Sequence, residues 1–234
     1  MIKKHFNIDN IPAILWGEYS NKIFIAIHGN MSNKEDDVIK ILASKVVDKG
    51  YQVISFDLPE HGERKEEKTP CKVQNCVQEL TLVINYVKEK YNNISLFACS
   101  MGAYFSLLSY KNEDIKQSLF LSPVVNMKIV IDNMMKYFNV DEDSLEKEKV
   151  IETPINQKLY WDYYCYVKKH PIDTWNSPTS ILYGSKDDVS DREIVIDFSK
   201  KFNCNLTIMN DGDHYFHTKE QLKFFELWLE NNIK

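Results

Sequence analysis

The chain has 234 residues, of which 44% are apolar and 27% charged. That length and composition can bury one full core and exclude a disordered or fibrous protein. The net charge is −5, and no stripe of basic residues with interleaved aromatics occurs, which argues against a nucleic-acid-binding face. Only seven glycines are present, where average usage gives about 16, so we expect each to lie where the backbone requires it.

No apolar run approaches the ~20 residues that a membrane helix needs, so we expect no membrane span. The N-terminal residues lack the apolar segment of a signal peptide. The five cysteines show no paired metal-ligand spacing, and such a scattered set indicates reduced thiols. We therefore expect a cytoplasmic protein with no metal site and no cofactor.

Short apolar runs typical of strands alternate with amphipathic segments typical of helices. Strands are predicted at residues 11–18, 22–27, 51–56, 94–99, 118–121, 179–183 and 206–209. A first helix is predicted to begin at a capping box formed by Ser32 and Glu35 and to end at Gly50. Further helices are predicted at 73–90 and 103–110 and after each of the strands 179–183 and 206–209. This alternation predicts an α/β fold with a mostly parallel sheet of about eight strands and helices on both faces.

Between residues 127 and 175 the alternation stops and no strand pattern is visible. Two or three helical pieces surround the acidic run 141–152, which we interpret as a solvated connection, and residues 159–167 are rich in aromatics. We expect a small helical cap at 127–175, inserted into a single core formed by residues 1–126 and 176–234.

A candidate nucleophile follows the predicted strand 94–99. Ser100 has Ala98 two positions before it and Gly102 two positions after it, and a helix is expected directly beyond. This pattern is typical of a nucleophile elbow, in which strand and helix approach closely around a strained turn. The N-terminal amides of the helix would favour an oxyanion beside the serine. A serine that merely caps an ordinary helix is the alternative, and this motif alone does not decide between the two.

Four further motifs accompany this one. They lie at 25–30, 56–64, 182–189 and 210–216 and read IAIHGN, FDLPEHGER, LYGSKDDV and NDGDHYF. In this order, and over nearly the whole chain, the five motifs resemble those of the α/β-hydrolase family. Within it, they are similar to the small lipase-, esterase- and aminopeptidase-like members with a short cap, such as monoacylglycerol lipase-like proteins.

The resemblance implies a catalytic triad in the order Ser, Asp, His, with Ser100 as nucleophile and His214 as general base. Asp187 lies three residues after the glycine of its turn and is favoured over the adjacent Asp188 as the carboxylate that orients the imidazole. His214 is favoured over His217, which lies where the last helix is expected to begin.

The resemblance also implies an oxyanion hole. Its two backbone donors would be the N–H groups of Met101 and Asn30. His28 and His61 match family positions that organise loops by hydrogen bonding and do not transfer protons.

Hydrolysis of a carboxylic ester through an acyl-enzyme is the reaction that we expect. The substrate would be a small-molecule ester with an apolar acyl or aromatic group, and Tyr160, Trp161 and Tyr164 of the cap are candidate contacts. These aromatics would equally serve to pack the cap onto the sheet. A peptidase, amidase or thioesterase using the same triad is an alternative, and a small-ligand-binding protein on a hydrolase scaffold is the non-enzyme alternative.

Overall fold

The computed structural model describes residues 1–234. Its main sheet has eight strands: β1 (Lys3–Ile8), β2 (Ile11–Trp16), β3 (Lys22–Ile27), β4 (Gln52–Phe56), β5 (Asn93–Cys99), β6 (Ile115–Leu121), β9 (Thr179–Gly184) and β10 (Asn205–Met209). Their order across the sheet is β1-β2-β4-β3-β5-β6-β9-β10. The six strands from β4 to β10 are parallel, whereas β2 pairs antiparallel with both of its neighbours.

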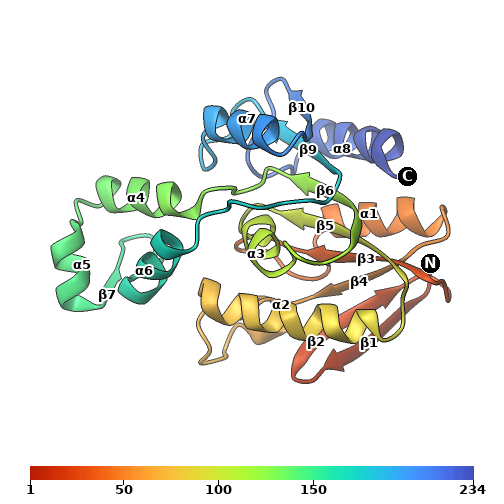
Figure 1. Ribbon diagram of the computed structural model, residues 1–234, viewed down its shortest axis with the longest axis horizontal. Helices are drawn as coiled ribbons and strands as arrows, with labels where there is room; N and C mark the ends of the chain where they lie inside the picture. Colours follow the sequence, from red (N-terminus) through yellow and green to blue (C-terminus); the bar gives the residue numbers. More distant parts are fainter.

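Helices cover both faces of this sheet (Figure 1). One apolar cluster joins it to α2 (Val73–Lys88), α3 (Met101–Ser109) and α7 (Arg192–Lys201). A second cluster joins the other face to α1 (Asp37–Val47) and α8 (Lys219–Asn232). The central strands β3 and β4 are almost wholly buried, as expected for strands covered on both faces. The predicted α/β class and mostly parallel sheet are confirmed.

The segment 127–175, which connects β6 to β9, contains α4 (Met127–Tyr137), α5 (Glu142–Glu148) and α6 (Trp161–Lys169). It projects from the molecule on the side opposite both termini (Figure 1). It also contains a two-stranded antiparallel sheet of β7 (Val150–Glu152) and β8 (Lys158–Tyr160). The prediction of no strand here was wrong, because two three-residue strands are too short to produce a readable alternation. The acidic run is also more than a connection, since α5 lies within it.

Two predictions near the N-terminus need correction. The edge strand β1 was not predicted, because its residues are mostly polar and exposed. The first helix does not begin with a capping box at Ser32. It begins at Asp37, and the carboxylate of Asp36 caps it by accepting from the N–H of Val38. None of the helices has the length and apolar composition required to cross a membrane.

The turns after β9 and β10 are in direct backbone contact. The N–H of Lys186 donates to the carbonyl of Gly212 at 2.8 Å, and the N–H of Ser185 donates to the carbonyl of Met209 at 2.9 Å. A Cβ added to Gly184 would lie 2.3 Å from the carbonyl oxygen of Gly212. Glycine is therefore required at position 184 by the space available and not by the backbone angles.

We predict that Gly184→Ala lowers the free energy of unfolding by about 2–3 kcal/mol, because two backbones must separate to admit the methyl group. The matched control is Gly50→Ala, where a Cβ meets nothing within 4 Å and only the positive φ of 79° opposes it. We expect the control to lose about 1 kcal/mol. Urea unfolding of the two variants measures the difference, and equal losses would contradict the steric argument.

Candidate active site

Ser100 occupies the sharp turn between β5 and α3. Its φ of 48° and ψ of −123° lie in a region that a non-glycine residue rarely adopts. The turn is held by the N–H of Ser100, which donates to the carbonyl of Leu121 at 3.1 Å, and by the carbonyl of Ser100, which accepts from Val124 at 3.0 Å. A Cβ on Gly102 would lie 2.4 Å from the carbonyl oxygen of His28. The small residue expected at this position therefore allows the elbow to contact the end of β3.

The structure brings Ser100, His214 and Asp187 together from three separate turns. The Nε2 atom of His214 lies 2.8 Å from the Oγ of Ser100, and its Nδ1 lies 2.7 Å from Oδ2 of Asp187. A carboxylate can only accept, so the proton belongs on Nδ1 and Nε2 is free to accept from the hydroxyl. This tautomer is the one that a general base requires.

The carboxylate of Asp187 is fully buried and its orientation is fixed. Its Oδ1 accepts from the N–H groups of Val189 at 2.9 Å and Ser190 at 2.8 Å, which leaves Oδ2 directed at His214. Asp188 is exposed and makes no such contact. His217, the other histidine considered, is also exposed, and its Nδ1 bonds to the carbonyl of Tyr215.

Two backbone N–H groups beside Ser100 are free to bind an anion. Met101 is the first residue of α3, so its N–H has no partner within the helix. The N–H of Asn30, in the loop after β3, makes no hydrogen bond within the chain. A Cβ on Gly29 would lie 3.0 Å from the Cβ of Ser100, so this loop runs directly alongside the serine. The geometry suits a developing negative charge at this position.

Two histidines hold the loop after β3, in agreement with the loop-organising role expected for them. The N–H of Leu58 donates to Nε2 of His28 at 3.0 Å, and Nδ1 of His28 bonds to the carbonyl of Gly29 at 2.7 Å. The N–H of Met31 donates to Nε2 of His61 at 3.1 Å. Full burial lowers the pKa of His28 to about 4, so the ring is neutral and can accept.

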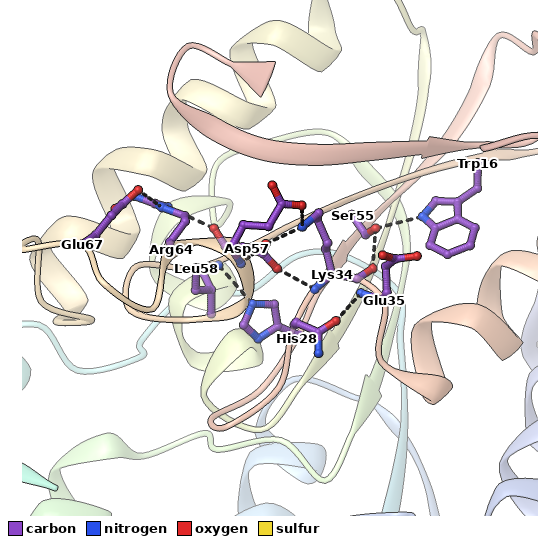
Figure 2. Close-up of polar contacts among 11 residues, drawn as sticks. Trp16, His28, Lys34, Glu35, Ser55, Asp57, Leu58, Arg64 and Glu67 are labelled. Carbon is purple, nitrogen blue, oxygen red and sulfur yellow. Dashed lines mark hydrogen bonds and ion pairs between the residues drawn. The ribbon is translucent and has the colours of Figure 1, made fainter. Parts of the chain in front are cut away.

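A buried ion pair supports the same loop (Figure 2). The carboxylate of Asp57 accepts from Nζ of Lys34 at 2.5 Å and from its N–H at 2.9 Å, and it also accepts from the N–H of Glu63 at 3.0 Å. Burial alone would lower the pKa of Lys34, but hydrogen bonds to Asp57 and Glu63 outweigh burial and raise it. The lysine therefore stays charged and ties the loops after β3 and β4 together.

The sequence did not reveal this pair. Lys34 is a lone lysine in a polar loop, which is ordinarily a surface residue. Asp57 lies within the FDLPEHGER motif, but that motif assigns it no partner. The signal that could have drawn attention to it is Gly62, where an added Cβ would lie 2.2 Å from the carboxylate of Asp57. One motif thus contains both the buried acid and the glycine that makes room for it.

The aromatic residues named as candidate substrate contacts lie on β8 and α6. Tyr164 is buried within the segment 127–175, and its hydroxyl donates to Asp132 at 2.9 Å. The ammonium group of Lys72 lies over the ring of Tyr160, 5.1 Å from the ring centroid. Trp161 is half-buried. Tyr164 therefore packs against other residues of the segment 127–175. Contact of Tyr160, Trp161 or Tyr164 with substrate stays a prediction.

Known proteins resemble this chain in sequence or in structure over nearly its whole length. No protein-family model matches it. A monoglyceride lipase homolog of Monkeypox virus is 25% identical over 98% of this chain and 98% of its own. Est1E from Butyrivibrio proteoclasticus, solved with ferulic acid bound, has a TM-score of 0.77 at 19% identity, covering 97% of this chain and 96% of its own. The esterase Pf2001 of Pyrococcus furiosus has a TM-score of 0.68 at 21% identity, covering 98% and 90%.

The buried, neutral His28 makes stability depend on pH. Between pH 6.5 and 4 the unfolded chain binds a proton at this histidine that the folded chain excludes, so acid favours unfolding. We predict that the wild type loses about 3 kcal/mol more than His28→Gln over this range. Urea unfolding of both proteins at several pH values isolates the difference from other titrating groups. Parallel pH curves would contradict a neutral His28.

Proposed function

We propose that the chain is a serine hydrolase of the α/β-hydrolase superfamily, similar to esterases and lipases, that cleaves carboxylic esters through an acyl-enzyme on Ser100. The observation that carries this proposal is the hydrogen-bonded series from Ser100 through His214 to Asp187. Three residues far apart in sequence meet at 2.7–2.8 Å in the tautomeric arrangement that transfers a proton away from the serine.

In the first half of the proposed reaction, Oγ of Ser100 attacks the ester carbonyl while Nε2 of His214 takes its proton. The imidazolium that forms is stabilised by the buried carboxylate of Asp187. The carbonyl oxygen becomes an oxyanion, which accepts from the N–H groups of Met101 and Asn30. His214 then returns its proton to the leaving alcohol, and the acyl group remains on Ser100.

In the second half, water takes the place of the alcohol. His214 removes a proton from that water, which attacks the acyl carbon and regenerates the same oxyanion. The intermediate collapses to release the carboxylic acid, and His214 returns the proton to Oγ of Ser100. No cofactor takes part in either half.

The substrate that we propose has an apolar acyl or aromatic group. Support comes from the composition of the segment 127–175, the proposed cap, which is rich in the aromatic and methionine side chains that line apolar binding sites. Est1E, which has this fold, binds ferulic acid, an aromatic acid, and this supports an aromatic group in the proposed substrate.

We predict that Ser100→Ala abolishes labelling by a fluorophosphonate probe and lowers turnover of p-nitrophenyl esters by about 10⁵-fold. Ser109→Ala is the matched control, since Ser109 lies at the far end of α3 and its hydroxyl bonds only to the carbonyl of Phe105. That variant should label and turn over as the wild type does. A probe adduct on any other residue, or none on the folded wild type, would refute a nucleophilic Ser100.

The two adjacent aspartates give a second prediction. Asp187→Asn should lower kcat by about 10³–10⁴-fold, because the amide disturbs the tautomer and no longer stabilises the imidazolium. Asp188→Asn should leave kcat close to that of the wild type, because this side chain is exposed. Steady-state kinetics on one ester compares the two variants. Equal losses would show that Asp187 is not the orienting acid.

A further inference from the structure

Two of the five cysteines lie next to each other beside the site. Cys71 is in the loop that precedes α2, and Cys76 lies within the first turns of that helix. Their Sγ atoms are 3.7 Å apart. The Cys71 side chain is half-buried, whereas Cys76 is fully buried in the core. The sulfurs must approach each other by about 1.6 Å to reach the ~2.05 Å of a disulfide bond.

The surroundings of Cys71 favour its thiolate. A hydrogen bond with Cys76 and the interaction with His61 together outweigh burial and lower the pKa of Cys71 to about 6. The carboxylate of Glu60, which accepts from the N–H of Cys71 at 2.7 Å, opposes this effect but is outweighed. Burial raises the pKa of Cys76 well above its usual value. One sulfur is therefore nucleophilic and the other is kept as a thiol.

Residues next to this pair contact the loop after β3 and the segment 127–175. His61, which interacts with Cys71, has Nε2 3.1 Å from the N–H of Met31 and 3.2 Å from Oδ1 of Asn30. The next residue, Lys72, forms an ion pair at 2.5 Å with Asp162 of α6. A covalent change at Cys71 is therefore adjacent to the loop after β3 on one side and to the segment 127–175 on the other.

We propose that Cys71 and Cys76 are a peroxide-sensitive dithiol, whose oxidation to a disulfide lowers the activity of the neighbouring site. Cys71 is the sulfur that reacts with the peroxide, and Cys76 is the sulfur that resolves the product. The effect on activity rests on the proposed function, whereas the formation of the disulfide does not.

Hydrogen peroxide is the oxidant. The thiolate of Cys71 attacks one peroxide oxygen, an S–O bond forms, and the O–O bond breaks with release of hydroxide, which gains a proton to become water. Cys71 is then a sulfenic acid. The sulfur of Cys76 attacks the Cys71 sulfur as its own proton passes to the departing hydroxide, which leaves as a second water. Two thiols and one peroxide thus give one disulfide and two waters.

The disulfide would change the bonding of His61. Nε2 of His61 lies within hydrogen-bond distance of both the N–H of Met31 and Oδ1 of Asn30. A neutral Nε2 accepts from Met31 and a protonated Nε2 donates to Asn30; burial lowers the pKa of His61, and the hydrogen bond with Cys71 outweighs burial and raises it. A disulfide removes that effect of Cys71 and therefore favours the bond with Met31 over the bond with Asn30. The loop between these two partners carries the free N–H of Asn30, the proposed oxyanion donor. Oxidation therefore acts on the geometry of that donor.

Peptide mass spectrometry tests the disulfide directly. Trypsin cleaves between Lys72 and Val73, so a Cys71–Cys76 bond joins the separate peptides 69–72 and 73–88. We expect brief treatment of the reduced protein with hydrogen peroxide, followed by alkylation, to yield this joined pair and to leave Cys99, Cys165 and Cys204 alkylated. Cys76→Ala should instead accumulate a sulfenic acid at Cys71 that dimedone traps, and Cys71→Ser should yield neither product.

Cys165→Ser is the matched control, because Cys165 is a half-buried cysteine of α6 outside the pair. It should form the joined peptides as the wild type does. Oxidation of Cys165 or Cys204 as fast as Cys71, or oxidation of Cys71 to the sulfinic acid with no joined peptide, would overturn the dithiol.

Ester turnover tests the regulation. We expect peroxide to lower kcat of the wild type by about tenfold or more, since loss of one oxyanion donor costs 10²–10³-fold, and a dithiol reductant to restore it. Cys71→Ser should keep its activity under the same treatment. Joined peptides with unchanged kcat would overturn the effect on the site. A reduced protein that hydrolyses no ester would refute the proposed function, while the peptide readout would still decide the dithiol.

Discussion

The arrangement of the site depends on the contact between the end of β3 and the turn at Ser100. At Gly102 there is no room for a side chain, because an added Cβ would lie 2.4 Å from the carbonyl oxygen of His28. At Gly29 an added Cβ would come within 3.0 Å of the Cβ of Ser100. This close approach places the N–H of Asn30 beside the serine, next to the N-terminal N–H of α3. A larger residue at either glycine would separate the two donors from the oxygen that they would bind.

Such a contact positions the loop after β3 only if the loop has one conformation. The loop has no regular structure, and its tip is exposed, with Met31 89% accessible at a positive φ. The Lys34–Asp57 ion pair fixes its conformation by joining it to the loop after β4, in which Asp57 lies. Breaking such a buried pair by removing one partner costs about 3–5 kcal/mol, although an apolar replacement of both can be neutral. We therefore interpret the buried ion pair as a contact that holds the loop in one conformation, and not as one that raises the stability of the fold.

The sequence predicted the α/β class, most of the strands and the residues that meet at the site, because these depend on local signals. Buried parallel strands appear as continuous apolar runs, and each site turn contains a glycine. What it did not predict depends on contacts that the residue pattern of a single segment does not specify. Edge strand β1 is defined by its pairing with β2, and Lys34 has the same local surroundings as a surface lysine. The 3.7 Å approach of Cys71 to Cys76 depends on how the chain enters α2, which residue types alone do not specify.

The two sides of the site are held in chemically different ways. The turns that carry Asp187 and His214 are joined by backbone hydrogen bonds, by the contact of Gly184 with Gly212 and by an exposed ion pair of Lys186 with Asp211, and none of these contacts involves a cysteine. The loop that carries Asn30 is held by side chains, and these include His61, whose proton depends on Cys71. A reagent that reacts at Cys71 would therefore leave the geometry of the proposed triad unchanged and alter the proposed oxyanion donor. Chemical control of the proposed enzyme through Cys71 is expected to act through stabilisation of the oxyanion and not through the proton transfer at Ser100.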